Sequence, residues 1–236
     1  MIDIHSHLIY GVDDGSKDIE TSLKVLSNLS ENGVTDIILT PHYIVDTNYV
    51  SKKTDNIIKL KELQREVKKL GININLYLGN EIYIDKDILK YIKENKMCSL
   101  NNTEYILVEL PMSGVYEDYL DIFSNLINIG FKVILAHPER YTSFQKDYSL
   151  IDEVVATGVL LQSNIDSIVG GYGKEAKKTM KYILKNKLVS FVGTDIHNNK
   201  SDYSYINKAI NKFKKYLTDD EINDILNKNA MKIIKG

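Results

Sequence analysis

Short apolar runs alternate with stretches of helical periodicity along the chain, and this alternation constrains the fold more than any other feature. Seven runs rich in Ile, Val and Leu are expected to form strands: Met1–His5, Asp36–Thr40, Ile74–Leu78, Tyr105–Glu109, Lys132–Ala136, Val159–Gln162 and Leu188–Gly193. Their nearly continuous apolar texture is typical of parallel strands that are buried on both faces.

The segments between these runs have the apolar spacing of amphipathic helices. Apolar residues recur three or four positions apart in two sets: Ile19, Leu23, Leu26 and Leu29, then Leu60, Leu63, Val67 and Leu70. Ser16 is a candidate N-cap for the first helix and Gly33 a candidate stop. Strand followed by helix, repeated, predicts a parallel α/β sheet or barrel. We expect one domain over residues 1–236, a length that α/β barrels commonly use.

Charge and cysteine content argue against several classes of protein. The formal net charge is -2, which gives no basic footprint for nucleic acid or for an anionic membrane. The single cysteine, Cys98, cannot form an internal disulfide, and no arginine follows it closely to bind a phosphate. No apolar run reaches about 18 residues, and we expect no cleaved leader before the first strand. We therefore expect a cytoplasmic protein that does not use cysteine chemistry.

Every histidine lies at the end of an expected strand: His5, His7, His42, His137 and His197. One histidine in such a place is more often a structural residue or a helix cap than a ligand, but five together reverse that expectation. The carboxyl ends of the strands in a parallel barrel form one rim, where such folds build active sites. His5 and His7 are two positions apart, so in extended backbone both imidazoles point to the same side.

Carboxylates accompany the histidines at these strand ends: Asp14, Glu81, Glu109 and Asp195. A carboxylate that ends an apolar strand is costly to bury unless it meets a cation, so Glu81 and Glu109 favour a metal site. Imidazole and carboxylate ligands without thiolate suit manganese, iron or zinc. Three divalent ions would bring about six positive charges against about four carboxylates, and the positive cavity would suit a phosphate dianion and acidify a bound water.

Further residues near the same strand ends are candidates for contacting a substrate. Arg140, in His137-Pro138-Glu139-Arg140, could bind phosphate, although a surface salt bridge is the alternative interpretation. Asn164 ends the sixth strand and is a candidate donor to a ligand or to the substrate. Three tyrosines close to ligand motifs are candidate rim residues: Tyr10, Tyr43 and Tyr141. A glycine-rich turn, Gly170-Gly171-Tyr172-Gly173, could bind an anion, but such clusters are more often loops or helix entries.

Together these motifs resemble the polymerase and histidinol phosphatase (PHP) superfamily, and within it the manganese-dependent protein-tyrosine phosphatases of bacterial capsule and exopolysaccharide loci. The matching segments run through most of the chain: Met1–His7, Asp13–Gly15, Thr40–His42, the Glu81 segment, Tyr105–Glu109, Ala136–Arg140 and Asp195–Asn198. One histidine pair is a weak signal, whereas seven motifs in this order are specific.

The resemblance implies the PHP fold, a distorted TIM-like (β/α)7 barrel, with three divalent metal ions, manganese above all. One ion would take His5, His7, Glu81 and Asp195; a second would share Glu81 and add Glu109 and His137; the third would take Asp14, His42 and His197. It also implies that a metal-bridging hydroxide attacks phosphorus in line, with Arg140, His42 and Asp195 as catalytic residues. Arg140 would stabilise charge on the phosphate or the leaving oxygen.

The implied substrate is phosphotyrosine on an autophosphorylating cytoplasmic tyrosine kinase that regulates capsule or exopolysaccharide synthesis, with membrane contact only through that kinase. One alternative is a small-molecule phosphatase of the same superfamily, such as a histidinol phosphatase. A second is a non-catalytic barrel, against which the complete ligand set argues. The chain departs from the family at Asp202, where relatives often carry a second arginine, and Lys200 is a candidate replacement.

Overall fold

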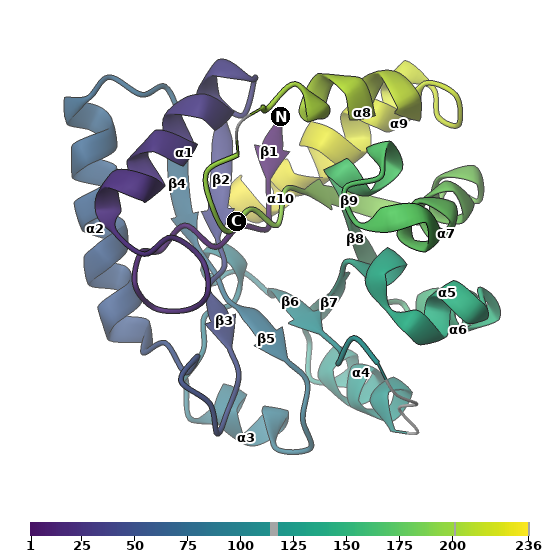
Figure 1. The fold of residues 1–236 in the computed structure, drawn as a ribbon. Helices are drawn as coiled ribbons and strands as arrows, with labels where there is room; N and C mark the ends of the chain where they lie inside the picture. Colours follow the sequence, from purple (N-terminus) through teal and green to yellow (C-terminus); the bar gives the residue numbers. More distant parts are fainter. Residues whose placement is uncertain (114–117, 201, 236) are drawn as a thin grey trace.

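The computed structural model describes residues 1–113, 118–200 and 202–235, and in these ranges the strands lie at the centre with helices around them (Figure 1). All paired strands are parallel and form two sheets, ordered β1-β2-β4 and β3-β5-β6-β7-β8-β9. Their bounds are β1 Ile2–Asp3, β2 Asp36–Leu39, β3 His42–Tyr43, β4 Asn75–Leu78, β5 Glu81–Tyr83, β6 Tyr105–Glu109, β7 Lys132–Ala136, β8 Leu160–Asn164 and β9 Val189–Gly193.

All seven strands that the sequence predicts are confirmed, and two short ones are additional. Pro41 separates β2 from β3, and Gly79 with Asn80 separates β4 from β5. The buried Asn80 side chain fixes this break, because it donates to the Pro41 carbonyl at 2.8 Å and accepts from the Cys98 amide at 2.8 Å. Two strand positions therefore begin in the small sheet and continue in the large one.

Hydrogen bonds beyond the last strand join it to the first. The Asp195 amide donates to the His5 carbonyl at 2.8 Å, and the His7 amide donates to the Ile196 carbonyl at 2.9 Å. The buried Asp3 carboxylate accepts from the Thr194 amide at 3.0 Å. With these bonds the strands follow one another around a ring, which agrees with the predicted distorted barrel and brings the two ends of the sequence motifs together.

Helices connect the strands: α1 Ile19–Glu31, α2 Lys53–Lys69, α3 Ile88–Lys93, α4 Tyr119–Asn128, α5 Thr142–Lys146, α6 Ser149–Ala156, α7 Gly173–Lys185, α8 Tyr205–Phe213, α9 Asp219–Asn223 and α10 Asn229–Lys235. The expectation that Ser16 caps α1 is wrong, because Asp18 caps it by accepting from the Thr21 amide at 2.8 Å. Gly33 has a φ of 88° just after α1, as expected of a stop. Within the described ranges, no helix is both long and apolar enough to cross a membrane.

The barrel interior is filled by apolar side chains toward the amino ends of the strands. Ile4, Ile38, Leu107, Ile134 and Phe191 belong to this inner cluster and are buried. Ala230 and Ile233 of α10 join the same cluster, so the last helix covers the amino end of the barrel. Among the described residues, polar groups occupy the carboxyl end instead.

Candidate metal centre

All nine side chains predicted as ligands come together at the carboxyl ends of the strands. Eight of them form three overlapping groups, and within each group the ligand atoms lie within 4.8 Å of one another. The groups are His5, His7, Glu81 and Asp195; His42, Glu81 and Glu109; and His7, Asp14, His42 and His197. The ninth side chain, His137, lies beside Glu81. Most of these side chains are buried, and Asp14 and His197 are the more exposed members. The predicted ligands therefore lie close together at one end of the strands, as the barrel topology predicts.

The first group is fully buried and surrounds one point. His5 Nε2 and His7 Nε2 face each other at 3.2 Å. Glu81 Oε2 lies 3.2 Å from each of these nitrogens, and Asp195 Oδ1 lies 3.4 Å from each. The two positions of separation between His5 and His7 thus put both imidazoles on the same side, as the sequence predicts.

Glu81 links the first group to the other two. Its Oε1 lies 2.8 Å from His137 Nε2, and its Oε2 lies 3.1 Å from His42 Nδ1. Glu109 approaches both histidines, at 3.3 Å from His42 Nδ1 and 3.8 Å from His137 Nε2. Four of the five histidines are therefore within ion-pair distance of one carboxylate.

The third group is open to solvent. Asp14 Oδ1 lies 3.5 Å from His42 Nε2 and 3.4 Å from His197 Nε2. The His197 ring stacks on the His7 ring, with centroids 3.9 Å apart. Because the Asp14 side chain is 48% exposed, a substrate could approach the cluster from this side.

The spacing of these atoms suits metal ions better than direct hydrogen bonds. Glu81 Oε2 has three imidazole nitrogens at 3.1–3.2 Å, yet neither it nor His42 Nδ1 makes a hydrogen bond to any described residue. Short distances with poor hydrogen-bond angles mean that the lone pairs point at shared positions between the ligands. Two ligands each about 2.1 Å from one ion lie about 3.0–3.4 Å apart, which matches the observed spacing.

The electrostatics of the cluster also fit a cation. Burial lowers the pKa of His5, but Glu81 and Asp195 outweigh it and raise that pKa to about 9. Burial raises the pKa of Glu81, but His5 and His42 outweigh it and hold the pKa well below its usual range. Protonated imidazoles thus neutralise buried carboxylates here, and a divalent cation would replace those protons.

Two residues that orient the ligands were not predicted from the sequence. Asp13 Oδ2 lies 2.9 Å from His7 Nδ1 and also accepts from the His42 amide at 3.0 Å. Gln162 Oε1 lies 2.8 Å from His5 Nδ1. Each leaves Nε2 of its histidine facing the cluster, as outer partners of ligating histidines do. Asp13 stands in the Asp13-Asp14 motif and was the more visible of the two in the sequence.

Backbone geometry at the site is unusual in two ligands. His137 has a φ of 35° and Asp195 a φ of 51°, both in the left-handed region that non-glycine residues rarely adopt. Gly15 is required for close approach, because a Cβ there would lie 2.1 Å from the His7 carbonyl oxygen. The loop that carries Asp13 and Asp14 can therefore fold tightly over His7.

Arg140 and Asn164, two predicted substrate-contacting residues, both bind Asp195. Arg140 Nη1 donates to Asp195 Oδ2 at 2.7 Å, and Asn164 Nδ2 donates to the same oxygen at 2.8 Å. Tyr172, which was not predicted, places its hydroxyl 3.3 Å from that oxygen. Arg140 does form a salt bridge, but its partner is a buried carboxylate of the cluster and not a surface residue.

The three predicted rim tyrosines lie in different environments. Tyr10 donates to Glu62 of α2 at 2.5 Å, and Tyr43 is buried with its ring 6.1 Å from that of Tyr91. Tyr141 was expected at the rim but is 1% exposed and donates to the Ala136 carbonyl, so it is a core residue. Tyr49 instead stacks on His42, with ring centroids 5.9 Å apart.

The Asp202 side chain, where the chain departs from the expected motif, contacts none of the clustered side chains among the described residues. Asp202 is exposed and accepts from the Ser204 hydroxyl at 2.7 Å and from Lys208 at 3.4 Å. Lys200 pairs with the buried Asp166 at 2.9 Å and lies over the Tyr205 ring. The Asp202 carboxylate is thus exposed and held by neighbouring residues of its own segment.

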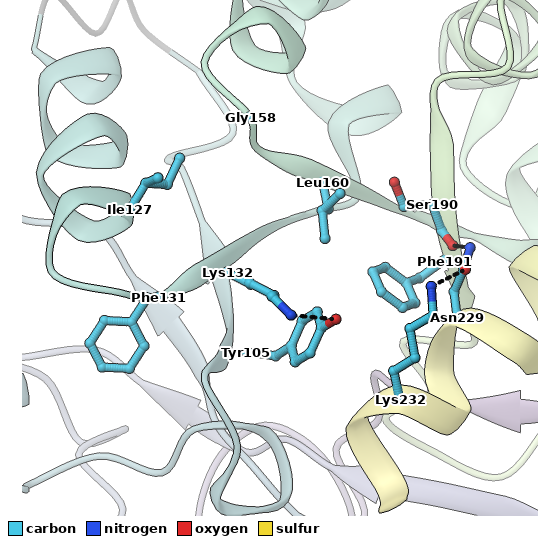
Figure 2. A pocket seen from close by; sticks show the side chains of 10 residues that line it. All are labelled: Tyr105, Ile127, Phe131, Lys132, Gly158, Leu160, Ser190, Phe191, Asn229 and Lys232. Atoms are coloured by element: carbon cyan, nitrogen blue, oxygen red, sulfur yellow. Dashed lines mark hydrogen bonds between the residues drawn. The ribbon is translucent and has the colours of Figure 1, made fainter. Parts of the chain in front are cut away.

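A separate pocket of about 410 Å³ lies at the amino ends of the strands (Figure 2). Tyr105, Lys132 and Leu160 line it from the first residues of β6, β7 and β8, with Phe191 and Lys232 at the side of β9 and α10. It contains none of the nine clustered side chains. The cavity and the metal-ligand cluster are therefore at opposite ends of the barrel.

A model of the family described as "Capsular polysaccharide synthesis, CpsB/CapC" matches residues 1–235. The chain belongs to the CpsB/CapC family. The tyrosine-protein phosphatase CpsB of Streptococcus agalactiae serotype III is 30% identical over 242 residues, which cover 100% of this chain and 99% of that protein.

Two solved structures resemble the chain to different degrees. One comes from the structures of two metal-dependent tyrosine phosphatases, YwqE of Bacillus subtilis and CpsB of Streptococcus pneumoniae, and gives a TM-score of 0.87 at 28% identity. This match covers 94% of this chain and 90% of the other. Histidinol phosphate phosphatase of Lactococcus lactis gives 0.64 at 16% identity, covering 91% and 93%, and so shares the fold. Together these matches confirm that the chain has the predicted α/β fold, which these phosphatases share.

Proposed function

We propose that the chain is a metal-dependent protein-tyrosine phosphatase, acting as one functional unit over residues 1–236. The observation that carries this proposal is Glu81 Oε2, a buried carboxylate oxygen with three imidazole nitrogens at 3.1–3.2 Å and no hydrogen bond to any described residue. Membership of the CpsB/CapC family and the names of the relatives support phosphotyrosine as the substrate.

The residues present fit three divalent ions, with manganese as the proposed metal. His5, His7, Glu81 and Asp195 would hold one ion, and Glu81, Glu109 and His137 a second, with His42 Nδ1 also close to it. Asp14, His42 and His197 would hold a third. Such ions supply Lewis acidity toward phosphoryl oxygens and acidify water at neutral pH.

The chain's own residues orient the phosphate. Arg140 uses one nitrogen for Asp195, and its remaining N–H groups, free of bonds to the described residues, are available for phosphoryl oxygens. Asp195 would couple this arginine to the ligand cluster, because one carboxylate oxygen faces His5 and the other accepts from Arg140. His42 stands between two ligand groups beside the open side of the site. These three positions make Arg140, His42 and Asp195 the proposed catalytic residues.

Phosphotyrosine is a substrate that this machinery can release without a strong acid. The phenol leaving group has a pKa of about 10, so it needs less protonation than an alkyl alcohol does. We propose as the protein substrate an autophosphorylating tyrosine kinase of capsule or exopolysaccharide synthesis, met in the cytoplasm. Any contact with the membrane would then be made through the kinase.

The test is hydrolysis of a phosphotyrosine peptide by metal-stripped protein before and after manganese is added back. His137→Ala is the test variant, and Lys232→Ala, at the opposite end of the barrel, is the matched control. Turnover restored by manganese in the wild type and control but absent from the test variant is the expected result. Turnover of histidinol phosphate alone would replace the proposal by a small-molecule phosphatase, and no turnover of either would refute both.

A further inference from the structure

Tyr172 lies at the edge of the cluster although neither the ligand motifs nor the strand pattern points to it. It follows Gly170 and Gly171 and immediately precedes α7, in the turn that the sequence marked only by its glycines. Gly171 lets this turn pack against Asp166, since a Cβ there would lie 2.5 Å from Asp166 Oδ2. The tight turn directs Tyr172 toward the site.

The Tyr172 ring lies against the guanidinium group of Arg140, with 4.5 Å between Arg140 Cζ and the ring centroid. A guanidinium group over an aromatic face is attracted to it, and more strongly where water is excluded. The Arg140 side chain is 26% exposed, so the stack is largely shielded from solvent. The ring therefore lies in direct contact with the guanidinium group.

Asp195 joins this stack to the ligands. Its Oδ1 lies 3.4 Å from the His5 and His7 nitrogens, while its Oδ2 receives Arg140 at 2.7 Å and the Tyr172 hydroxyl at 3.3 Å. The Tyr172 hydroxyl is the donor in this contact, because a carboxylate oxygen accepts. Ring and hydroxyl thus constrain the same arginine and carboxylate.

We propose that Tyr172 is a positioning residue that holds Arg140 in the plane needed to bind the phosphoryl group. This inference rests on the proposed phosphatase function. It assigns a role to the ring, which orients the guanidinium group, and a smaller one to the hydroxyl, which completes the donor set on Asp195. Tyr172 itself need not touch the substrate.

The orientation can be measured without any enzymatic activity. The chain has only two arginines, Arg65 and Arg140, so ¹⁵N-arginine labelling gives two Nε–Hε resonances. In zinc-loaded protein, Tyr172→Leu should shift the Arg140 resonance and leave the Arg65 resonance unchanged. Tyr172→Phe keeps the ring and should shift the Arg140 resonance less. Tyr182→Leu, on α7, whose side chain pairs with Asp152, is the matched control. An Arg140 resonance that is the same in Tyr172→Leu and wild type would overturn the proposal.

A double-mutant cycle tests the functional consequence. In the protein that retains Arg140, Tyr172→Leu should lower kcat/KM for a phosphotyrosine peptide about 10-fold or more. In the Arg140→Ala background, the same change should have almost no further effect, because the group that Tyr172 orients is missing. An equal loss in both backgrounds would mean a merely structural role and would contradict the proposal.

Binding of inorganic phosphate separates this inference from the proposed function. Titration calorimetry of zinc-loaded protein should show weaker phosphate binding in Tyr172→Leu than in wild type and Tyr182→Leu. If no phosphotyrosine peptide is hydrolysed, the proposed function fails, while the arginine resonance and phosphate binding still decide the role of Tyr172. Equal phosphate affinity in all three proteins would overturn that role.

Discussion

At their carboxyl ends the strands carry five histidines and four carboxylates that face one another, whereas at their amino ends the same strands surround apolar side chains. Tyr105, Leu160 and Phe191 line the amino-end pocket (Figure 2). The two lysines beside them, Lys132 and Lys232, are exposed. Lys132 there pairs with Glu104, both half exposed. Glu81, in contrast, is buried among imidazoles.

This difference shows how one barrel separates stability from chemistry. Apolar burial at the amino end stabilises the fold without a ligand. Buried carboxylates at the other end are unfavourable unless cations or protons neutralise them. Substitutions at the two ends should therefore have different consequences, and the following experiments are ordered from the largest expected effect on activity to the smallest.

Removing the carboxylate shared by the ligand groups should have the largest effect. Glu81→Gln keeps the size of the side chain but removes its charge, and we expect phosphatase activity to fall roughly 10³-fold because metal-ion catalysis is worth several kcal/mol. The matched control is Glu104→Gln at the amino end, where we expect no change. Activity of both variants, assayed in saturating manganese, checks this. Similar losses in both would remove the distinction between the ends.

Changing a residue that hydrogen-bonds to a ligand histidine should have an intermediate effect. Asp13→Asn weakens the contact that orients His7, and we expect roughly 10- to 100-fold weaker metal binding or activity. Metal affinity from competition with a chromophoric chelator is the measurement. Gln162→Ala, behind His5, should behave in the same way. Unchanged affinity in both would mean that the ligands need no outer support.

A cavity at the amino end should affect stability instead of chemistry. Phe191 is 2% exposed, and Phe191→Ala should lower the free energy of unfolding by about 3–5 kcal/mol. Metal affinity and activity per folded molecule should stay at wild-type values. Urea unfolding and chelator competition on the same samples measure the two quantities. A loss of metal affinity in folded Phe191→Ala would show that the two ends are coupled.

The smallest effect is expected at Cys98. Burial raises the pKa of its thiol to about 11, so at pH 7.5 only roughly 0.03% is thiolate, and the reactive form appears only as the pH rises toward that value. Iodoacetamide at pH 7.5 should leave activity unchanged, and so should Cys98→Ala. Inactivation by iodoacetamide that Cys98→Ala prevents would contradict the metal-based account.

Much of the fold could be predicted because strand ends and apolar runs are local signals. All seven predicted strands formed, but β3 and β5 have only two or three residues each and follow breaks at Pro41 and Gly79, so no apolar run marks them. Tyr141 was misplaced because closeness to a motif in the sequence does not tell whether a side chain faces the rim or the core.

For the candidate site, the sequence predicts which residues are ligands but not their backbone geometry or the residues that orient them. The strand ends placed the nine clustered side chains on one rim, but the left-handed backbone of His137 and Asp195 has no sequence signature. The contacts of Gln162 and Tyr172 depend on segments far apart in the chain, at 157 residues from His5 and 23 residues from Asp195. Such contacts follow from tertiary packing, which periodicity does not encode.

Anomalous diffraction from crystals grown with manganese, recorded near the manganese absorption edge, tests the central claim most directly. Three peaks should lie among the nine clustered side chains, one of them between His5, His7, Glu81 and Asp195, and the amino-end pocket should show none. An occupied amino-end pocket, or a carboxyl-end cluster without any peak, would contradict the account.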